Sequence, residues 1–268
     1  MEQQNSTLLV DSHAHLNELA DRRLSAIFDQ ENPKLVVISN SADVESSRRN
    51  LKIAKKFRSI IPFYGIHPEI FSRPNSTPID VEHIDSMVTE IKKILSRGSG
   101  IGEVGLDSKY GSLDSQKYLF EKMLSLAEST SFPVTLHCRE SVSAILETIA
   151  SYNLKGKILF HWFAGTEEEL GRVNERGMYT TYGPSILFSK RLSRLLSRSD
   201  PELLLSETDT PTRFNSLTKD EGNPLMIASV YFKMAATLKI SFDSLREKLL
   251  QNTNEYLGTQ TSLRVKSN

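Results

Sequence analysis

The sequence has little cysteine and no excess of either charge, and each shortage excludes a class of protein. Its single thiol, Cys138, cannot form a disulfide within the chain, which indicates a reducing compartment. Because 33 basic residues are balanced by 33 acidic ones, the chain lacks the strongly basic surface that binds long nucleic acids electrostatically. An anionic substrate would therefore need local neutralisation, which a bound divalent cation could supply.

Long apolar runs are also missing. Residues 1–9 contain no basic stretch followed by an apolar core, and no later run approaches the length of a membrane span. We therefore expect no membrane association and a cytoplasmic location. With 38% hydrophobic and 25% charged residues, a chain of 268 residues can bury a sizeable core. We expect one domain over 1–268, with a polar tail at about 259–268.

What is present is an alternation of strand-like and helix-like segments. The first predicted strand leads into His13 and His15, and seven more lie at 34–39, 60–67, 100–107, 132–139, 157–163, 178–183 and 203–209. Helical patterns follow these strands at 18–30, 43–57, 79–96, 113–130, 142–149, 166–177, 192–197, 224–238 and 242–257. Thr166 and Glu169 are spaced as a capping box. The count predicts an α/β fold, a (β/α)8 TIM-type barrel, with a doubly wound open sheet as the alternative.

Histidines and carboxylates stand at the C-terminal ends of the predicted strands. His13 and His15 are one residue apart, so their imidazoles can converge on one ion only if the backbone is extended. Later strands end in further candidate ligands: His67, Glu103, His137, His161 and Asp209. In a barrel these ends face one mouth, where active sites are found. Five of the six histidines occupy such positions, which predicts a metal site.

This set of ligands is larger than one ion requires. Four imidazoles and two carboxylates could hold two divalent cations, with Glu103 as the bridge between them. Two such ions activate a water and clamp the oxygens of an in-line displacement, which suits phosphodiester hydrolysis. Asp209, as a ligand of one ion, could also accept the proton of the water. The mixed nitrogen and oxygen donors admit zinc, manganese and magnesium.

Several neighbouring residues have more than one interpretation. His67 either contacts metal or substrate or simply caps a strand end. Glu207 shares strand parity with Asp209, so one of them is expected as a ligand and the other as its support. Cys138 should point away from the mouth and be buried. One face of the short helix at 192–197 is basic and is interpreted as solvated, with nucleic-acid contact as the alternative; its residues are Lys190, Arg194 and Arg198.

In these stretches the sequence resembles the TatD family of metal-dependent deoxyribonucleases, within the amidohydrolase superfamily of barrels. The matching segments keep the family's order: DSHAHL at 11–16, GIHP at 65–68, IGEVGLD at 101–107, PVTLHCR at 133–139, HWFAG at 161–165 and ETDTP at 207–211. The resemblance implies a barrel, two divalent ions and hydrolysis of single-stranded DNA from the 3' end. The ligands it implies are His13, His15, Glu103, His137, His161 and Asp209. It also implies that His67 and Arg139 contact the substrate phosphate.

The sequence departs from the family's pattern at the mouth of the barrel. Trp162 and Ala164 stand in a segment that usually reads His-Cys-Phe-Ser-Gly, and the loop after Pro211 lacks the usual basic, asparagine-containing stretch. These changes do not touch the metal ligands. They leave more than one class of substrate consistent with the sequence. An ester or amide hydrolase of the same superfamily, such as an aminoacyl-RNA deacylase, is therefore the alternative to a DNA exonuclease. The sequence names no protein partner, although one could supply the basic surface that the chain lacks.

Overall fold

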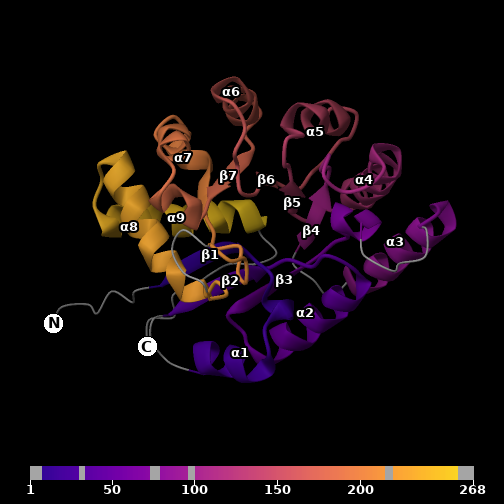
Figure 1. The fold of residues 1–268 in the computed structure, drawn as a ribbon, viewed down its shortest axis with the longest axis horizontal. Helices are drawn as coiled ribbons and strands as arrows, with labels where there is room; N and C mark the ends of the chain where they lie inside the picture. The colour runs from indigo at the N-terminus through magenta and orange to yellow at the C-terminus, as the bar shows by residue number, and fades with distance from the viewer. Residues whose placement is uncertain (1–7, 30–33, 73–78, 96–99, 215–219, 259–268) are drawn as a thin grey trace.

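The computed structural model describes residues 8–29, 34–72, 79–95, 100–214 and 220–258, and in these residues eight parallel strands form one sheet (Figure 1). Each strand pairs with its neighbour in the sequence, from β1 to β8. The strands are β1 (Leu9–Ala14), β2 (Leu35–Ser39), β3 (Ile60–Tyr64), β4 (Gly100–Gly105), β5 (Val134–His137), β6 (Ile158–Phe160), β7 (Tyr179–Tyr182) and β8 (Leu204–Ser206). Nearly all their residues are buried, as continuous apolar runs in a parallel sheet predict.

The turn after β8 returns to β1 and closes the sheet. The backbone N–H of Asp209 donates to the carbonyl of His13 at 2.9 Å. The N–H of His15 donates to the carbonyl of Thr210 at 2.6 Å. A doubly wound sheet would reverse its strand order at a switch point, whereas the order in the described residues is sequential throughout. The predicted TIM-type barrel is therefore confirmed.

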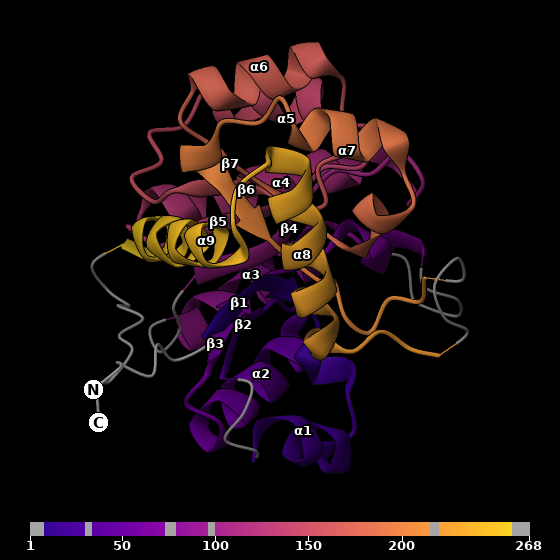
Figure 2. The same cartoon turned by 90° about the vertical axis from the view of Figure 1, so that its left-hand side faces the viewer.

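Helices surround the sheet, and α8 and α9 pack where β8 meets β1 (Figures 1 and 2). The helices are α1 (Asp21–Phe28), α2 (Val44–Lys56), α3 (Val81–Leu95), α4 (Leu113–Glu128), α5 (Val142–Ile149), α6 (Glu167–Glu175), α7 (Lys190–Leu196), α8 (Ile227–Leu238) and α9 (Phe242–Leu257). Short 3-10 turns also occur at Leu16–Glu18, Pro68–Ser72, Pro184–Leu187, Pro201–Leu203 and Pro224–Met226. Each strand is thus followed by covering segments, which is the arrangement of a barrel.

Side-chain caps fix where two of these helices begin. The hydroxyl of Thr166 accepts from the N–H of Glu169, and the carboxylate of Glu169 accepts from the N–H of Thr166. This capping box confirms the predicted start of α6. The hydroxyl of Ser189 accepts from a backbone N–H in the first turn of α7. Since this cap places the start at Lys190, α7 begins two residues before the predicted position.

Most strands end before their predicted last residue, and β3, β6 and β8 each end three residues early, so that His67, like the ligands after β6 and β8, lies beyond its strand. β6 stops at Phe160 instead of 163, and β8 stops at Ser206 instead of 209. The backbone turns into the left-handed region at Trp162, with φ 42°, and at Asp209, with φ 53°. Neither conformation can continue a strand. The candidate ligands after β6 and β8 are therefore carried on turns rather than in the ladder.

Helix lengths also differ from the predictions at a few ends. The helix predicted over 18–30 begins at Asp21, because a 3-10 turn comes first. The predicted C-terminal ends of this helix and of the helix over 79–96 fall outside the described residues, as does the tail at about 259–268. In the part of the chain that the structure describes, no single helix is both long and apolar enough to cross a membrane. Pro224–Leu238 and Phe242–Leu257 reach that length and composition only as a pair, bent by 107°.

The interior of the barrel is packed by alternate strand residues below the site. This cluster of buried side chains includes Val36, Ile38, Ile61, Phe63, Leu159, Tyr179 and Leu205 from the strands, with Tyr256 from α9. The hydroxyls of Tyr256 and Thr135 are hydrogen-bonded at 2.8 Å, so the buried hydroxyl of Tyr256 is paired. Because these side chains fill the interior of the barrel, the polar side chains gather at the C-terminal ends of the strands.

Candidate metal centre

The structure brings all the predicted ligands together at one mouth of the barrel. The strands supply His13, Glu103 and His137. The turns just after the strands supply His15, His161 and Asp209. Glu103 is only 1% exposed and Asp209 only 7%. Burying two carboxylates is costly unless positive charge lies beside them. The arrangement therefore requires cationic partners, either protonated imidazoles or metal ions.

Four donor atoms form a first cluster around His13. The Nε2 atoms of His13 and His15 are 3.2 Å apart. Glu103 Oε2 lies 3.3 Å from the first of these nitrogens and 3.2 Å from the second. Asp209 Oδ1 lies 3.4 Å from both. Ligands about 2.0 to 2.1 Å from a tetrahedral ion are about 3.3 to 3.4 Å from one another, so His13, His15 and Asp209 are spaced as ligands of one divalent cation, with Glu103 Oε2 beside the two imidazoles.

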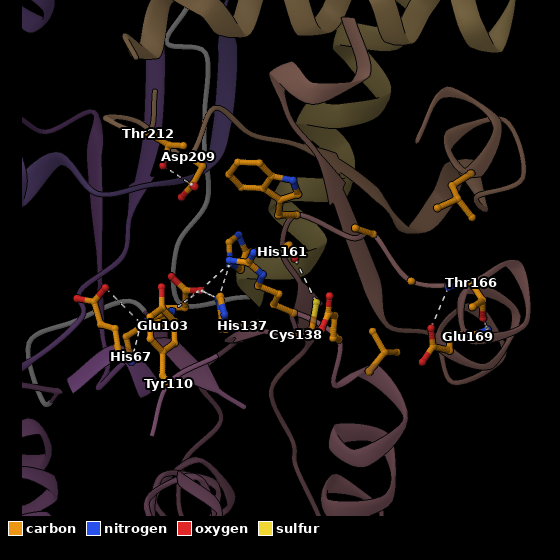
Figure 3. A pocket seen from close by; sticks show the side chains of 18 of the residues that line it. His67, Glu103, Tyr110, His137, Cys138, His161, Thr166, Glu169, Asp209 and Thr212 are labelled. Atoms are coloured by element: carbon orange, nitrogen blue, oxygen red, sulfur yellow. Dashed lines mark hydrogen bonds and ion pairs between the residues drawn. The ribbon is translucent and has the colours of Figure 1, made fainter. Parts of the chain in front are cut away.

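The other carboxylate oxygen of Glu103 faces a second cluster (Figure 3). Its Oε1 atom lies 2.7 Å from His137 Nδ1 and 2.6 Å from His161 Nε2. These two nitrogens are 3.4 Å apart. His67 Nε2 stands further away, 3.7 Å from the same oxygen. Oε2 of Glu103 thus faces His13 and His15 while Oε1 faces His137 and His161, as expected of a carboxylate that bridges two ions. The ligand atoms of Glu103 also lie within 4.8 Å of those of His13 and His161, and of those of His67 and His137.

Carboxylates lie behind two of the imidazoles. His137 points its Nε2 atom at Asp107 Oδ2, 2.8 Å away. A hydrogen bond of this kind fixes the tautomer of a metal-binding histidine and makes its other nitrogen more basic. Glu207 Oε2 lies 3.5 Å from His161 Nδ1, which makes no hydrogen bond with the residues that the structure describes. Glu207 therefore stands behind an imidazole, whereas Asp209 faces the first donor cluster.

Two further contacts that the sequence did not single out hold the turn after β8. The hydroxyl of Thr212 donates to Asp209 Oδ2 at 2.9 Å, which leaves Oδ1 aimed at the first cluster. The buried carboxylate of Asp11 accepts from the N–H of Thr208 at 2.9 Å and from its hydroxyl at 2.5 Å. Asp11 shares strand parity with the first histidine pair, and Asp107 shares it with Glu103, so parity could have pointed to both. No sequence pattern pointed to Thr212.

Burial and charge act in opposite directions on the ionisable groups. Burial lowers the pKa of His15, but hydrogen bonds to Asp209 and Glu103 outweigh it and raise that pKa well above the ordinary value. Burial raises the pKa of Asp209, yet the adjacent imidazoles hold it well below the usual carboxyl range. The pKa of Glu103 is held low in the same way, with His161 as the strongest opposing charge. The carboxylates are therefore ionised at neutral pH, and the site attracts positive charge.

His67 differs from the other histidines of the site. Its Nδ1 atom accepts from the backbone N–H of Glu69 at 3.1 Å. Burial, the largest influence, lowers its pKa to about 3, so the ring is neutral. A neutral imidazole whose Nδ1 accepts carries its proton on Nε2, which faces Glu103 Oε1. His67 therefore presents a hydrogen-bond donor to the pocket and is better suited to an oxyanion than to a metal ion.

The donor clusters open into a pocket of about 1110 Å³. Arg139 is exposed and lines this pocket, as expected of a substrate contact. The basic face of α7 is exposed, as predicted, but Arg194 lines the pocket as well, together with Arg191, which the sequence analysis did not single out. Cys138 is buried as expected, with its Sγ atom donating to the carbonyl of His161 at 3.3 Å. It lines the pocket, however, so the prediction that it points away from the mouth is wrong.

Comparison with known proteins identifies the family of the chain. The family described as TatD related DNase matches residues 10–258 of the chain. The chain therefore belongs to the TatD family. All six predicted ligands of this TatD-family protein fall within the matched segment, and the resemblance inferred from the sequence motifs is confirmed.

Similar proteins match this chain over most of its length. An uncharacterized metal-dependent hydrolase of Methanocaldococcus jannaschii is 24% identical over 249 residues, which are 92% of this chain and 96% of that protein. A 3'-5' ssDNA/RNA exonuclease TatD of Cronobacter turicensis is 28% identical over 206 residues, covering 70% and 74% of the two chains. The crystal structure of a TatD homologue from Escherichia coli superimposes with a TM-score of 0.82 at 21% identity, covering 92% and 97%. This structural likeness shows that the two chains share the barrel fold.

Proposed function

We propose that this protein is a metal-dependent deoxyribonuclease that releases nucleotides from the 3' ends of single-stranded DNA. The observation that carries the proposal is Glu103, whose two carboxylate oxygens face separate donor clusters. A bridged pair of divalent ions suits in-line displacement at phosphorus. The Cronobacter relative is described as a 3'-5' ssDNA/RNA exonuclease, which supports the polarity and the strandedness of the substrate.

The two clusters divide the proposed ligands between two ions. Two ions would share Glu103 and would be held by His13, His15 and Asp209 on one side and by His137 and His161 on the other. The mixture of imidazole and carboxylate donors fits zinc, manganese or magnesium. When bound, such ions lower the pKa of a water molecule and neutralise phosphate oxygens.

The chain's own residues then position the substrate and move the proton. Asp209 is ionised and lines the pocket, so its carboxylate can accept the proton of the attacking water. Thr212 keeps that carboxylate in place through Oδ2. The Nε2–H of His67 and the guanidinium of Arg139 donate to phosphate oxygens from the pocket wall. Asp209 and Glu103 are therefore the proposed catalytic residues.

A second candidate function rests on the charge of the same pocket. Its wall carries the carboxylates of Glu18, Glu69, Glu140 and Glu167. These would repel a polyanionic backbone, so a substrate with fewer phosphates near the site fits this wall better. An ester or amide hydrolase, such as an aminoacyl-RNA deacylase, is consistent with that charge because the same activated water can attack a carbonyl carbon.

Release of nucleotides from labelled DNA tests the leading proposal. The protein is stripped of metal, reloaded with magnesium, manganese or zinc, and incubated with single-stranded DNA labelled at its 3' end. We expect ion-dependent release of labelled mononucleotide, and we expect Glu103→Gln to abolish it because one neutral amide cannot bridge two cations. Glu45→Gln, an exposed position on α2, is the matched control and should release nucleotide at the unchanged rate.

The outcomes separate the two candidate functions. Ion-dependent release that is lost in Glu103→Gln and kept in Glu45→Gln supports the exonuclease. If protein that is shown to bind metal releases nothing with any ion, the exonuclease proposal is wrong. The same preparations are then assayed on aminoacyl-RNA and on simple esters and amides, where Glu103→Gln again serves as the inactive control.

Location, partners and domain organisation also stay predictions. We propose a cytoplasmic protein that acts on single-stranded DNA ends without membrane association, and cell fractionation tests the location. No protein partner is specified. We further propose that residues 1–268 form one domain, and limited proteolysis should then leave a single protected fragment that contains all the strands.

A further inference from the structure

The only tryptophan of the chain, Trp162, lines the pocket directly after a proposed metal ligand. Its backbone turns out of the strand direction, with φ 42°, and its N–H donates to the hydroxyl of Thr181 at 3.0 Å. This contact anchors the turn to β7. The residue is half-buried, so part of the indole stays accessible.

A second aromatic ring supports the indole from one side. Phe214, in the loop after β8, is 5% exposed. Its ring centroid lies 5.6 Å from that of Trp162, with an angle of 30° between the planes. Phe214 thus lies against one side of the indole, and the half-buried Trp162 keeps part of its surface on the pocket. The pair therefore forms a flat, supported aromatic surface beside the metal centre.

Positive charge lies on the same wall. The Nη1 atom of Arg191 donates to the carbonyls of Ala164 at 3.0 Å and Gly165 at 3.1 Å, just past Trp162 in the sequence. This pair of bonds ties α7 to the loop that carries the indole. Arg194, one turn further along α7, also lines the pocket. A ligand that joins a planar ring to a negatively charged group matches this combination of an aromatic surface and arginine side chains. A nucleotide is such a ligand.

We propose that Trp162 is a specificity-determining residue on which the base of the terminal nucleotide stacks while its phosphate reaches the Glu103 centre. This inference rests on the proposed function. It limits the substrate to DNA whose terminal nucleotide carries an intact base. Every base has a π face, so stacking tolerates all four bases. The enzyme should therefore discriminate strongly against an abasic end and only weakly among bases.

Because Trp162 is the only tryptophan, its fluorescence reports on this surface alone. The metal-loaded protein is excited at a wavelength selective for tryptophan and titrated with deoxyadenosine monophosphate or with deoxyribose 5-phosphate, which lacks a base. Binding of both ligands is measured in parallel by equilibrium dialysis. We expect the nucleotide to quench the emission and to bind at least about fivefold more tightly than the sugar phosphate. Unchanged emission at nucleotide concentrations that dialysis shows to be saturating would overturn the proposal.

Hydrolysis supplies an independent test with matched variants. Single-stranded DNA ending in a normal or an abasic nucleotide is offered to the wild type, Trp162→Ala and Trp162→Phe. Phe188→Ala removes another exposed aromatic ring, one that does not line the pocket, and is the control. We expect Trp162→Ala to lose at least about fivefold in kcat/KM on the normal end and little on the abasic end. Trp162→Phe should keep part of the preference, and Phe188→Ala all of it.

Metal uptake separates a failure of this inference from a failure of the proposed function. If Trp162→Ala binds metal normally and still prefers the normal end as strongly as the wild type, Trp162 is only a packing residue and the inference is wrong. If no variant releases nucleotide from any DNA, the exonuclease proposal fails. The fluorescence titration then still decides whether the indole stacks on a base.

Discussion

Removal of the charge on Asp107 should weaken one ion site and spare the other. Asp107 Oδ2 is 2.8 Å from His137 Nε2, and the opposite nitrogen of that ring belongs to the second donor cluster. Loss of a supporting carboxylate of this kind costs about 10- to 100-fold in metal affinity. Since the amide oxygen of Asp107→Asn can still accept from the ring, we expect a loss of about tenfold, or about 1.4 kcal/mol.

The complementary change lies on the other side of Glu103. Thr212→Val keeps the shape of the side chain but removes the hydroxyl that donates to Asp209 Oδ2 at 2.9 Å. Asp209 Oδ1 belongs to the first donor cluster, so this variant should weaken the first ion site and leave the second unchanged. The two variants therefore act on opposite sites, which a general loss of folding would not produce.

Calorimetric titration of the stripped protein with manganese or zinc measures both sites. The wild type should show two binding phases, Asp107→Asn should shift one of them, and Thr212→Val should shift the other. Asp114→Asn, at an exposed position on α4, is the matched control and should shift neither. The reasoning is refuted if Asp107→Asn leaves both phases unchanged or weakens both to the same extent.

Three further predictions concern pH, metal removal and the barrel core. Because Asp209 and Glu103 raise the pKa of His15, protons compete with metal, so affinity should rise with pH and binding should release protons, which calorimetry in buffers of different ionisation enthalpy detects. Ions at 100 times their Kd should stabilise the protein by about 2.7 kcal/mol for each site, or about 5.4 kcal/mol for two independent sites, and raise its Tm by about 11 to 22 °C, and an unchanged Tm on stripping would contradict this. Leu205→Ala, in the packed interior, should lower the free energy of unfolding in urea by about 2 to 5 kcal/mol, and a smaller loss would mean that the core refills the cavity.

Much of the fold could be predicted because periodic patterns reflect burial. Apolar runs predicted the strands, and the spacing of Thr166 and Glu169 predicted the start of α6. The site could be predicted for a related reason. Strands of a barrel end at one mouth, so the order of strands alone brings His13 and Asp209 together although they are distant in sequence.

The remaining features depend on turns whose course no periodicity describes. The left-handed backbone at Trp162 and Asp209 ends two strands early and aims both side chains. The packing of Phe214 against Trp162 joins loops after different strands, and the contact of Thr212 with Asp209 is a local turn contact without a repeating pattern. Such contacts can be identified only from the three-dimensional positions of the loops.

The position of manganese in crystals of the reloaded protein tests the central claim most directly. Anomalous scattering at the manganese edge locates the ions without reference to any assay. We expect two peaks, one beside Glu103 Oε2 with His13 and His15, and one beside Glu103 Oε1 with His137 and His161. A single peak, or two peaks that do not share Glu103, would contradict the account.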